Sequence, residues 1–345
     1  MKLNFEQIKS ITQGAEIIKK NDGINFFRFT KDEQRIYSTT EFYPKTFSTA
    51  GIRMDFITDG NELNLKIETK TATTRTYFSM DVFVNEKHIG SITNFDDSVS
   101  KEDYTVKNYQ LGKYFKKFTL GEGKKNVSII FPWSVATTLE EMEIENATYI
   151  VPFEKRKKLV LYGDSITNGY DALYSFNTYA VQLGNILDAE IYNKAIGGEV
   201  FFPELVGMSS ITEPDYVVVA YGSNDWGKKE REDFNIRCSK FFKEISYRYS
   251  KSTIFVITPI WRADYREYRK FGQFEEVEKY IKEVCSLYKN IRVISGFDFV
   301  PHDTNLFADL RLHPSDKGFE HYITNLSREI EKEVKNAWKI IWKIY

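Results

Sequence analysis

A chain of 345 residues is longer than one ordinary hydrophobic core spans, so two domains are expected. Hydrophobic residues make up 42% and charged residues 28%, a composition typical of soluble globular proteins and not of disordered chains. The net charge of -1 leaves no basic surface of the kind that binds nucleic acid, so a nucleic-acid partner is not expected.

The N-terminus contains no apolar segment of the kind found in a secretory signal peptide. No later stretch approaches the roughly 18 apolar residues that a membrane-spanning helix needs. We therefore expect a cytoplasmic protein with no membrane partner, unless a leader was removed. The two cysteines, Cys238 and Cys285, fall in predicted helices and indicate neither a disulfide framework nor a thiolate metal site.

Residues 26–153 have a pattern typical of β structure. Apolar and polar residues alternate at 51–57, 63–68 and 78–84, and turn-forming residues separate such runs at short intervals. Many short strands without intervening helices predict a β-sandwich or jelly roll. We assign this all-β accessory domain to residues 1–155.

The charge-dense stretch 154–158 marks a change of pattern. Five short apolar strands are predicted at 159–162, 190–192, 216–220, 254–257 and 291–294. Helices are predicted between and after them at 175–187, 233–249, 274–288 and 315–338. This alternation predicts a parallel sheet with helices on both faces, so residues 156–345 are expected to form an α/β flavodoxin-like three-layer sandwich.

The first of these strands stops at Gly163-Asp164-Ser165. A buried parallel strand that runs into a tight turn would present Ser165 at the carboxyl edge of the sheet, where α/β sheets place their ligands. Ser165 is therefore a candidate nucleophile. The alternative is a serine or aspartate that only caps the next helix.

Other polar residues follow the later strands and would lie at the same edge. A serine hydroxyl needs a base to take its proton, and His313 is the residue that we expect to do so, with His302 as its competitor. Acyl transfer also needs donors for the oxyanion. We expect the backbone N–H groups of Ser165 and Gly198 and the side-chain amide of Asn224 to supply them.

Two tryptophans lie next to these candidate residues in the sequence. Trp226 follows the segment that contains Asn224, and Trp261 follows the fourth predicted strand. Both are predicted to line the acyl or sugar pocket as substrate-binding residues. Packing in the core is the alternative for each.

In this order the segments resemble the four blocks of the SGNH (GDSL-type) esterase family. Residues 163–165 resemble the nucleophile block, and Gly198 resembles the glycine of the second block. Residues 222–225 resemble the Gly-x-Asn-Asp block, and His313 with its following proline resembles the last. Each segment alone is a weak signal, but four in order, each after a predicted strand, indicate this family.

The resemblance covers about residues 156–335. It implies that Ser165 attacks an ester carbonyl and forms an acyl-enzyme that water hydrolyses, with no metal or organic cofactor. With a β domain in front, the layout is similar to the two-domain acetyl-xylan and other sugar esterases of the second carbohydrate-esterase family. That likeness implies an acetylated sugar or oligosaccharide as substrate. The alternatives are a lipid acylhydrolase or thioesterase, and a catalytically inactive glycan-binding protein.

One spacing departs from the family pattern. The family places an aspartate three residues before the histidine, but Leu310 stands there, and the nearest carboxylate, Asp309, lies four residues before His313. We expect a bulged turn that lets Asp309 reach Nδ1 of His313. A dyad in which a backbone carbonyl orients the ring, or a role for Asp303, are the alternatives.

An apolar stripe at helical spacing ends the chain, with Lys and Glu between its members. The stripe consists of Ile330, Val334, Trp338, Ile341 and Trp342. It is expected to dock on the sheet or on the β domain. A contact between subunits of a homo-oligomer is the alternative.

Overall fold

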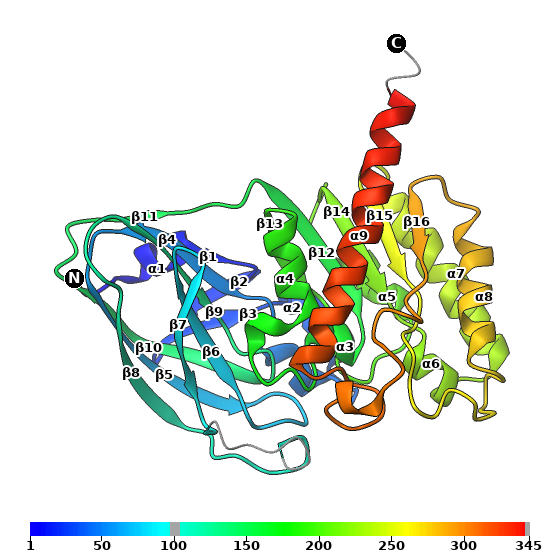
Figure 1. Cartoon of the computed structure of the whole chain (residues 1–345), viewed down its shortest axis with the longest axis horizontal. Coiled ribbons are helices and arrows are strands. Elements are labelled where there is room, and N and C mark those ends of the chain that lie inside the picture. The colour runs from blue at the N-terminus through cyan, green and yellow to red at the C-terminus, as the bar shows by residue number, and fades with distance from the viewer. Residues whose placement is uncertain (97–103, 342–345) are drawn as a thin grey trace.

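The chain folds as two halves that lie side by side, one built from antiparallel strands and the other from alternating strands and helices (Figure 1). The computed structural model describes residues 1–96 and 104–341, with side chains described up to residue 333. No helix within these ranges combines the length and the apolar character needed to cross a bilayer.

The first half contains two antiparallel sheets, so the predicted β-sandwich texture is present, while the jelly-roll connectivity stays a prediction. One sheet has the order β2-β3-β10-β5-β8, and the other has the order β1-β4-β9-β6-β7 with β11 paired to β4. The strands are β1 (Thr12–Gln13), β2 (Ile17–Lys20), β3 (Ile24–Phe27), β4 (Arg53–Thr58), β5 (Glu62–Thr71), β6 (Ser79–Val84), β7 (Lys87–Thr93), β8 (Lys113–Thr119), β9 (Lys125–Ile130), β10 (Val135–Glu145) and β11 (Ile150–Pro152). Alternate residues of β5, namely Leu63, Leu65 and Ile67, are fully buried in a core that both sheets share.

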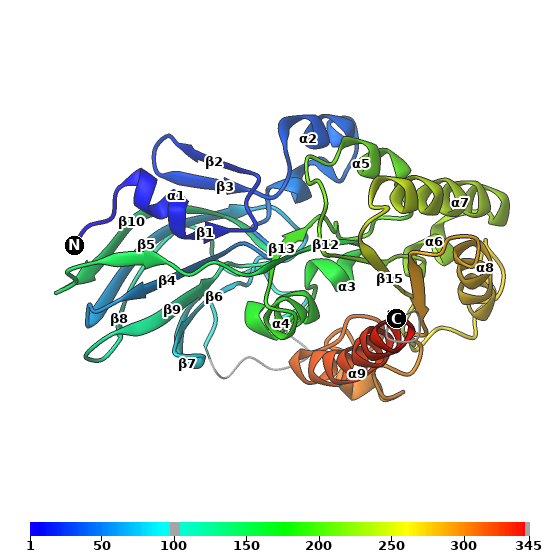
Figure 2. The same ribbon diagram turned by 90° about the horizontal axis from the view of Figure 1, so that it is seen from above.

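Helices also occur in the first half, where the sequence pattern predicted only strands. They are α1 (Phe5–Ile11), α2 (Lys31–Tyr37) and the 3-10 helix η1 (Tyr43–Phe47). A capping box starts α2, because Thr30 accepts from the N–H of Glu33 while the Glu33 carboxylate accepts from the N–H of Thr30. Tyr37 of α2 is buried in the core of the second half, so this N-terminal segment covers part of the α/β half (Figure 2).

The second half contains a five-stranded parallel sheet in the order β13-β12-β14-β15-β16. Its strands are β12 (Lys157–Gly163), β13 (Ala189–Asn193), β14 (Tyr216–Ala220), β15 (Thr253–Ile257) and β16 (Ile291–Ile294). Numbered along the chain this is 2-1-3-4-5, the flavodoxin-like order. The predicted parallel sheet is confirmed, and each predicted strand overlaps an observed one.

Helices cover both faces of this sheet, which gives three layers (Figure 2). One face packs against α4 (Tyr179–Ile186) and α9 (Asp316–Ile341), and the other against α5 (Pro203–Met208), α7 (Arg231–Arg248) and α8 (Glu275–Cys285). Leu159 and Leu161 of β12 point into the first layer, whereas Val160 and Tyr162 point into the second. The remaining short helices are α3 (Ser165–Asn168), α6 (Ser223–Lys228), η2 (Ser175–Asn177) and η3 (Thr304–Leu306).

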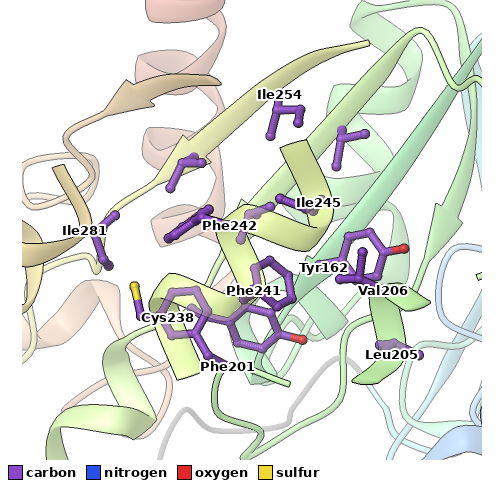
Figure 3. Close-up of a cluster of buried hydrophobic side chains, with 14 of the residues drawn as sticks. Tyr162, Phe201, Leu205, Val206, Cys238, Phe241, Phe242, Ile245, Ile254 and Ile281 are labelled. Carbon is purple, nitrogen blue, oxygen red and sulfur yellow. The ribbon is translucent and has the colours of Figure 1, made fainter. Parts of the chain in front are cut away.

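The core on the α7 face is rich in aromatic rings (Figure 3). Phe201 packs edge-on against Phe241 and Phe242, with ring centroids 5.4 Å apart in both pairs. Cys238 lies in the same cluster, and both it and Cys285 are buried free thiols. They therefore behave as small apolar side chains of this core.

The predicted C-terminal helix is present as α9. Of its apolar stripe, Ile330 is buried against the core on the α4 face. The structure does not describe the other side chains of the stripe, which are those of Val334, Trp338, Ile341 and Trp342. The expected docking or subunit contact therefore stays a prediction.

A cluster of aromatic side chains joins the two halves. Tyr77 and Trp133 of the first half pack with Tyr170 of the second. The Trp133 indole N–H donates to the main-chain oxygen of Ala172 at 2.9 Å. Because Tyr170 and Ala172 closely follow the Ser165 turn, the β half lies directly against the candidate site. The expected domain boundary at 155/156 falls between β11 and β12 and stays a prediction.

Candidate active site

The strand-to-helix turn after β12 holds Ser165. A Cβ on Gly163 would stand 2.3 Å from Oγ1 of Thr167 and 2.9 Å from the main-chain oxygen of Ala220, so only glycine fits there. Asp164 caps α3 by accepting from the N–H of Ile166 at 3.0 Å. The turn thus places Ser165 at the carboxyl edge of a central strand, where the side chain is nearly buried.

A hydrogen-bonded chain runs from Ser165 through His313 to Asp309. Oγ of Ser165 lies 2.8 Å from Nε2 of His313, and Oδ2 of Asp309 lies 2.8 Å from Nδ1. A neutral imidazole with its proton on Nδ1 donates to Asp309 and accepts from the Ser165 hydroxyl. This arrangement can remove the serine proton as the oxygen attacks a carbonyl.

The turn between Asp309 and His313 absorbs the extra residue of the unusual spacing. Leu310 takes a left-handed conformation with φ of 57°, which bulges the chain. Oδ1 of Asp309 then accepts from the N–H groups of Arg311 at 3.0 Å, Leu312 at 2.7 Å and His313 at 3.1 Å. The expected approach of Asp309 to the ring is therefore present, while its catalytic role stays a proposal.

The competing residues of the sequence analysis lie elsewhere. His302 stacks on the ring of Trp261 with centroids 5.3 Å apart and lies 3.1 Å from the carboxylate of Asp298. The carboxylate of Asp303 caps η3 by accepting from the N–H of Asn305. Neither residue takes part in the Ser165 chain.

A second carboxylate, which the sequence analysis missed, also faces His313. Oδ2 of the fully buried Asp171 lies 3.2 Å from Nδ1 of the ring. Arg75 of the β half binds both oxygens of Asp171, from Nε at 2.7 Å and from Nη2 at 3.0 Å. The Tyr77 hydroxyl donates to its Oδ1 at 3.0 Å, and the Tyr104 hydroxyl donates to its main-chain oxygen at 2.9 Å. The β half therefore fixes one of the two acids around the histidine.

These charges set the protonation of the ring. Burial acts to lower the pKa of His313, but the hydrogen bonds and charges of Asp171 and Asp309 outweigh it and raise the pKa to about 9. Burial opposes ionisation of both carboxyls, yet the imidazole and, for Asp171, Arg75 hold their pKa values below the usual range. The imidazolium form is thus favoured at neutral pH, and the basic form grows as the pH rises.

The spacing of three side chains at this site would also suit a metal ion. One possible ligand atom from each of Asp171, Asp309 and His313 lies within 4.8 Å of the other two. However, the positive charge beside these carboxylates is supplied by Arg75 and by the imidazole, not by a metal ion. The guanidinium of Arg75 already neutralises both oxygens of Asp171, and the imidazole occupies the space between the two carboxylates. The donor set is therefore that of a buried ion network and not that of a metal centre.

The expected oxyanion donors belong to the loops after three neighbouring strands, β12, β13 and β14. Gly198 has φ of 88°, a left-handed conformation that glycine adopts without strain. The side-chain amide of Asn224 donates to the main-chain oxygen of Glu199 at 3.1 Å, so Asn224 lies beside the Gly198 loop. The structure thus brings Asn224 and Gly198 together at the edge that holds Ser165, and their role as donors is a proposal.

The expected position of Trp226 in the substrate pocket is a misprediction. Its side chain has no exposed surface, its indole N–H donates to the main-chain oxygen of Gly272 at 2.9 Å, and Arg262 and Arg269 lie over its ring. Trp226 faces inward from α6 because the ring packs edge-on against Phe274 of the core. It therefore cannot contact a substrate in this structure.

Trp261 is also mostly buried, and the structure gives it packing contacts rather than a contact with Ser165. Besides stacking on His302, it packs against Phe307, with ring centroids 5.3 Å apart. An aromatic ring that does lie next to the Ser165–His313–Asp309 chain is that of Tyr170, whose centroid lies 5.6 Å from that of His313. Core packing, the alternative interpretation, accounts for the observed contacts of both tryptophans.

The comparison with family models gives one match. Residues 161–321 match the model of the GDSL-like Lipase/Acylhydrolase family, and this range contains Ser165, Gly198, Asn224 and His313. The comparison with curated proteins found no match. The family match therefore lies within the parallel-sheet half and does not extend into the antiparallel half.

Solved structures resemble the whole chain. One is SsfX3, a salicylyl-acyltransferase from a tetracycline biosynthetic pathway, with a TM-score of 0.78, 16% identity and coverage of 93% of this chain and 94% of that chain. Another is an acetyl xylan esterase, Est2A, from the rumen bacterium Butyrivibrio proteoclasticus, with a TM-score of 0.64, 14% identity and coverage of 97% and 98%. A family two carbohydrate esterase from Clostridium thermocellum, solved with cellohexaose, has a TM-score of 0.60, 16% identity and coverage of 82% and 92%. At these identities the likeness concerns the fold, which includes the antiparallel half.

Proposed function

With residues 161–321 identified as a GDSL-like lipase/acylhydrolase domain, a hydrolase of the SGNH type, we propose that the chain is a serine esterase that removes acetyl and other short acyl groups from carbohydrates. The observation that carries this proposal is the hydrogen-bonded chain from Ser165 through His313 to Asp309. The likeness of the two-part build to enzymes named carbohydrate esterases supports the choice of a sugar substrate.

The proposed reaction assigns one step to each of the candidate site residues. The Ser165 hydroxyl passes its proton to Nε2 of His313 as Oγ attacks the ester carbonyl carbon. The backbone N–H groups of Ser165 and Gly198 and the amide of Asn224 donate to the oxyanion. Nε2 then returns the proton to the departing sugar oxygen, which leaves an acyl group on Ser165.

Water completes the cycle at the acyl-enzyme. His313, neutral again, takes a proton from water as the water oxygen attacks the acyl carbonyl. The second oxyanion collapses, the proton moves from Nε2 to Oγ of Ser165, and the free acid leaves. Throughout both steps the carboxylate of Asp309 accepts from Nδ1 and stabilises the imidazolium that forms transiently.

A panel of esters tests this function. We expect hydrolysis of p-nitrophenyl acetate and release of acetate from acetylated xylo-oligosaccharides, with a sharp drop for butyryl and longer chains. Ser165→Ala should abolish both activities while the circular dichroism spectrum stays unchanged. Efficient hydrolysis of an octanoyl ester would favour a lipid acylhydrolase instead, and no hydrolysis of any ester by the wild type would favour a glycan-binding protein.

A further inference from the structure

Two lysines from different halves of the chain hold the Gly198 loop. Lys45 lies on η1, and Lys228 is the last residue of α6. Nζ of Lys45 donates to the main-chain oxygen of Gly197 at 2.6 Å, and Nζ of Lys228 donates to that of Gly198 at 2.7 Å. A Cβ built on Gly198 would stand 3.6 Å from the first Nζ and 3.4 Å from the second. Both ammonium groups therefore lie next to the proposed oxyanion donor.

Within residues 1–96 and 104–333, no carboxylate oxygen lies within 4.0 Å of Nζ of Lys45 or Lys228. Glu41 and Glu199 act on Lys45 only from a greater distance. The ring of Phe42 lies beside both ammonium groups, 5.1 Å from Nζ of Lys45 and 5.8 Å from Nζ of Lys228. Burial, and then the charge of Lys228, lower the pKa of Lys45. The two positive charges thus repel each other, and among the described residues no carboxylate lies close enough to either lysine to form an ion pair with it.

Their donors are not exhausted by these contacts. An ammonium group has three N–H donors, and each lysine uses one on a main-chain oxygen of the loop. The main-chain oxygen that Lys228 binds belongs to Gly198, whose N–H is the proposed oxyanion donor. An anion bound between the two lysines would therefore lie close to the carbonyl oxygen of the reacting ester.

We propose that Lys45 and Lys228 form a subsite for a carboxylate group that the substrate carries near its ester bond. This inference rests on the proposed function and narrows the substrate to esters that carry a carboxylate on the sugar or on the acyl group. A carboxylate on the alcohol side of the ester would belong to an acetylated uronic acid. A carboxylate on the acyl side would belong to a half-ester of a dicarboxylic acid. Both present the same anion to the ammonium pair.

Matched pairs of esters test the subsite. The first pair is the O-acetylated methyl glycoside of galacturonic acid and its uronate methyl ester, which differ in the charge and in one methyl group. The second pair is the p-nitrophenyl half-ester of succinic acid and its methyl ester. We expect the wild type to prefer the charged member of one pair by at least about tenfold in kcat/KM, mainly through KM, and to lose this preference as salt is raised.

Substitutions test whether the two lysines cause the preference for charged esters. In Lys45→Met with Lys228→Met, the ratio of charged to neutral kcat/KM should fall to about one. The control Lys229→Met removes a neighbouring lysine that pairs with Asp233 at 2.9 Å, and it should keep the wild-type ratio. An equal fall for charged and neutral esters would show that the pair only holds the loop, and a wild type without any preference would overturn the proposal.

Failure of the proposed function can be told apart from failure of the subsite. If the wild type hydrolyses no ester, the function is wrong, and the subsite is then judged by calorimetric titration with methyl galacturonoside against methyl galactoside. Binding of only the uronate by the wild type, and of neither sugar by the double variant, supports the subsite. Equal affinity of the wild type for both sugars overturns it.

Discussion

The two carboxylates around His313 are held in opposite ways. Asp309 is fixed within its own turn by three main-chain N–H groups, so a five-residue segment provides its position. Asp171 is fixed by side chains of the other half of the chain, above all by Arg75. The comparison teaches that the position of Asp309 is determined by the local sequence, whereas the position of Asp171 is determined only when the two halves have packed together. Each can be removed without removing the other.

The largest effect should come from removing the histidine that both acids share. We expect His313→Ala to lower kcat by about 10⁴ to 10⁶, as much as Ser165→Ala, because members of a catalytic unit do not act additively. Steady-state kinetics on p-nitrophenyl acetate measure this loss. His302→Ala is the matched control and should stay within a few fold of the wild type. A dead His302→Ala variant would reassign the base.

The second largest effect should come from Asp309, the carboxylate that its own turn holds in place. Asp309→Asn should lower kcat by at least about a hundredfold with little change in KM, because the amide cannot stabilise the imidazolium. Asp303→Asn, six residues before Asp309, is the control and should retain activity. Should Asp309→Asn keep full activity, the ring would be oriented by Asp171 and the assignment of the triad acid would move there.

A smaller effect, a shift in the pH dependence of kcat/KM, should report on Asp171, the carboxylate that the β half holds in place. Activity needs the neutral ring, so kcat/KM of the wild type should rise with pH and reach half of its maximum near pH 9, the pKa of His313. Asp171→Asn removes a negative charge and should move this midpoint down by at least one pH unit. Arg75→Gln leaves the charge of Asp171 uncompensated and should move it up.

The control for this pair is Asp298→Asn, which removes the carboxylate beside His302 and should leave the midpoint unchanged. Midpoints come from kcat/KM between pH 5 and 10 on a substrate that does not titrate. Shifts of Asp171→Asn and Arg75→Gln in the same direction would indicate a loss of packing rather than the charge effect.

The smallest effect on activity should come from the tryptophan that the sequence placed in the pocket. Trp226→Phe replaces a buried indole, whose N–H donates to Gly272, by a smaller phenyl ring, so it should cost about 1 to 3 kcal/mol of unfolding free energy. Urea denaturation measures this cost. The kcat/KM for acetyl esters should stay within a few fold, and a large change in acyl-chain preference would return Trp226 to the pocket.

The parts of the molecule that short patterns encode were predictable. Runs of three to five mostly apolar residues located every strand of the parallel sheet, and the polar residues after them located Ser165, His313 and the Asn224 segment. Asp309 was found because it lies close to His313 in the sequence. The helix α2 was missed, although Thr30 and Glu33 form a capping box that could have signalled it.

The rest depends on contacts between distant segments. Arg75 and Asp171 are 96 residues apart, and no pattern in either segment indicates that they meet. The orientation of Trp226 was mispredicted because closeness to a motif in sequence does not tell which way a side chain faces. Only the packing of α6 against Phe274 turns that ring inward.

The ion pair between Arg75 and Asp171 joins the two halves, so neither half can be exchanged for that of another enzyme without breaking this pair. An accessory half transplanted from another enzyme would bring its own loop to the histidine and would leave Asp171 buried without a cation. Chimeras at this junction should therefore be made with both residues inherited from the same parent. The same reasoning predicts that the α/β half produced alone would be a poor catalyst even if it folded.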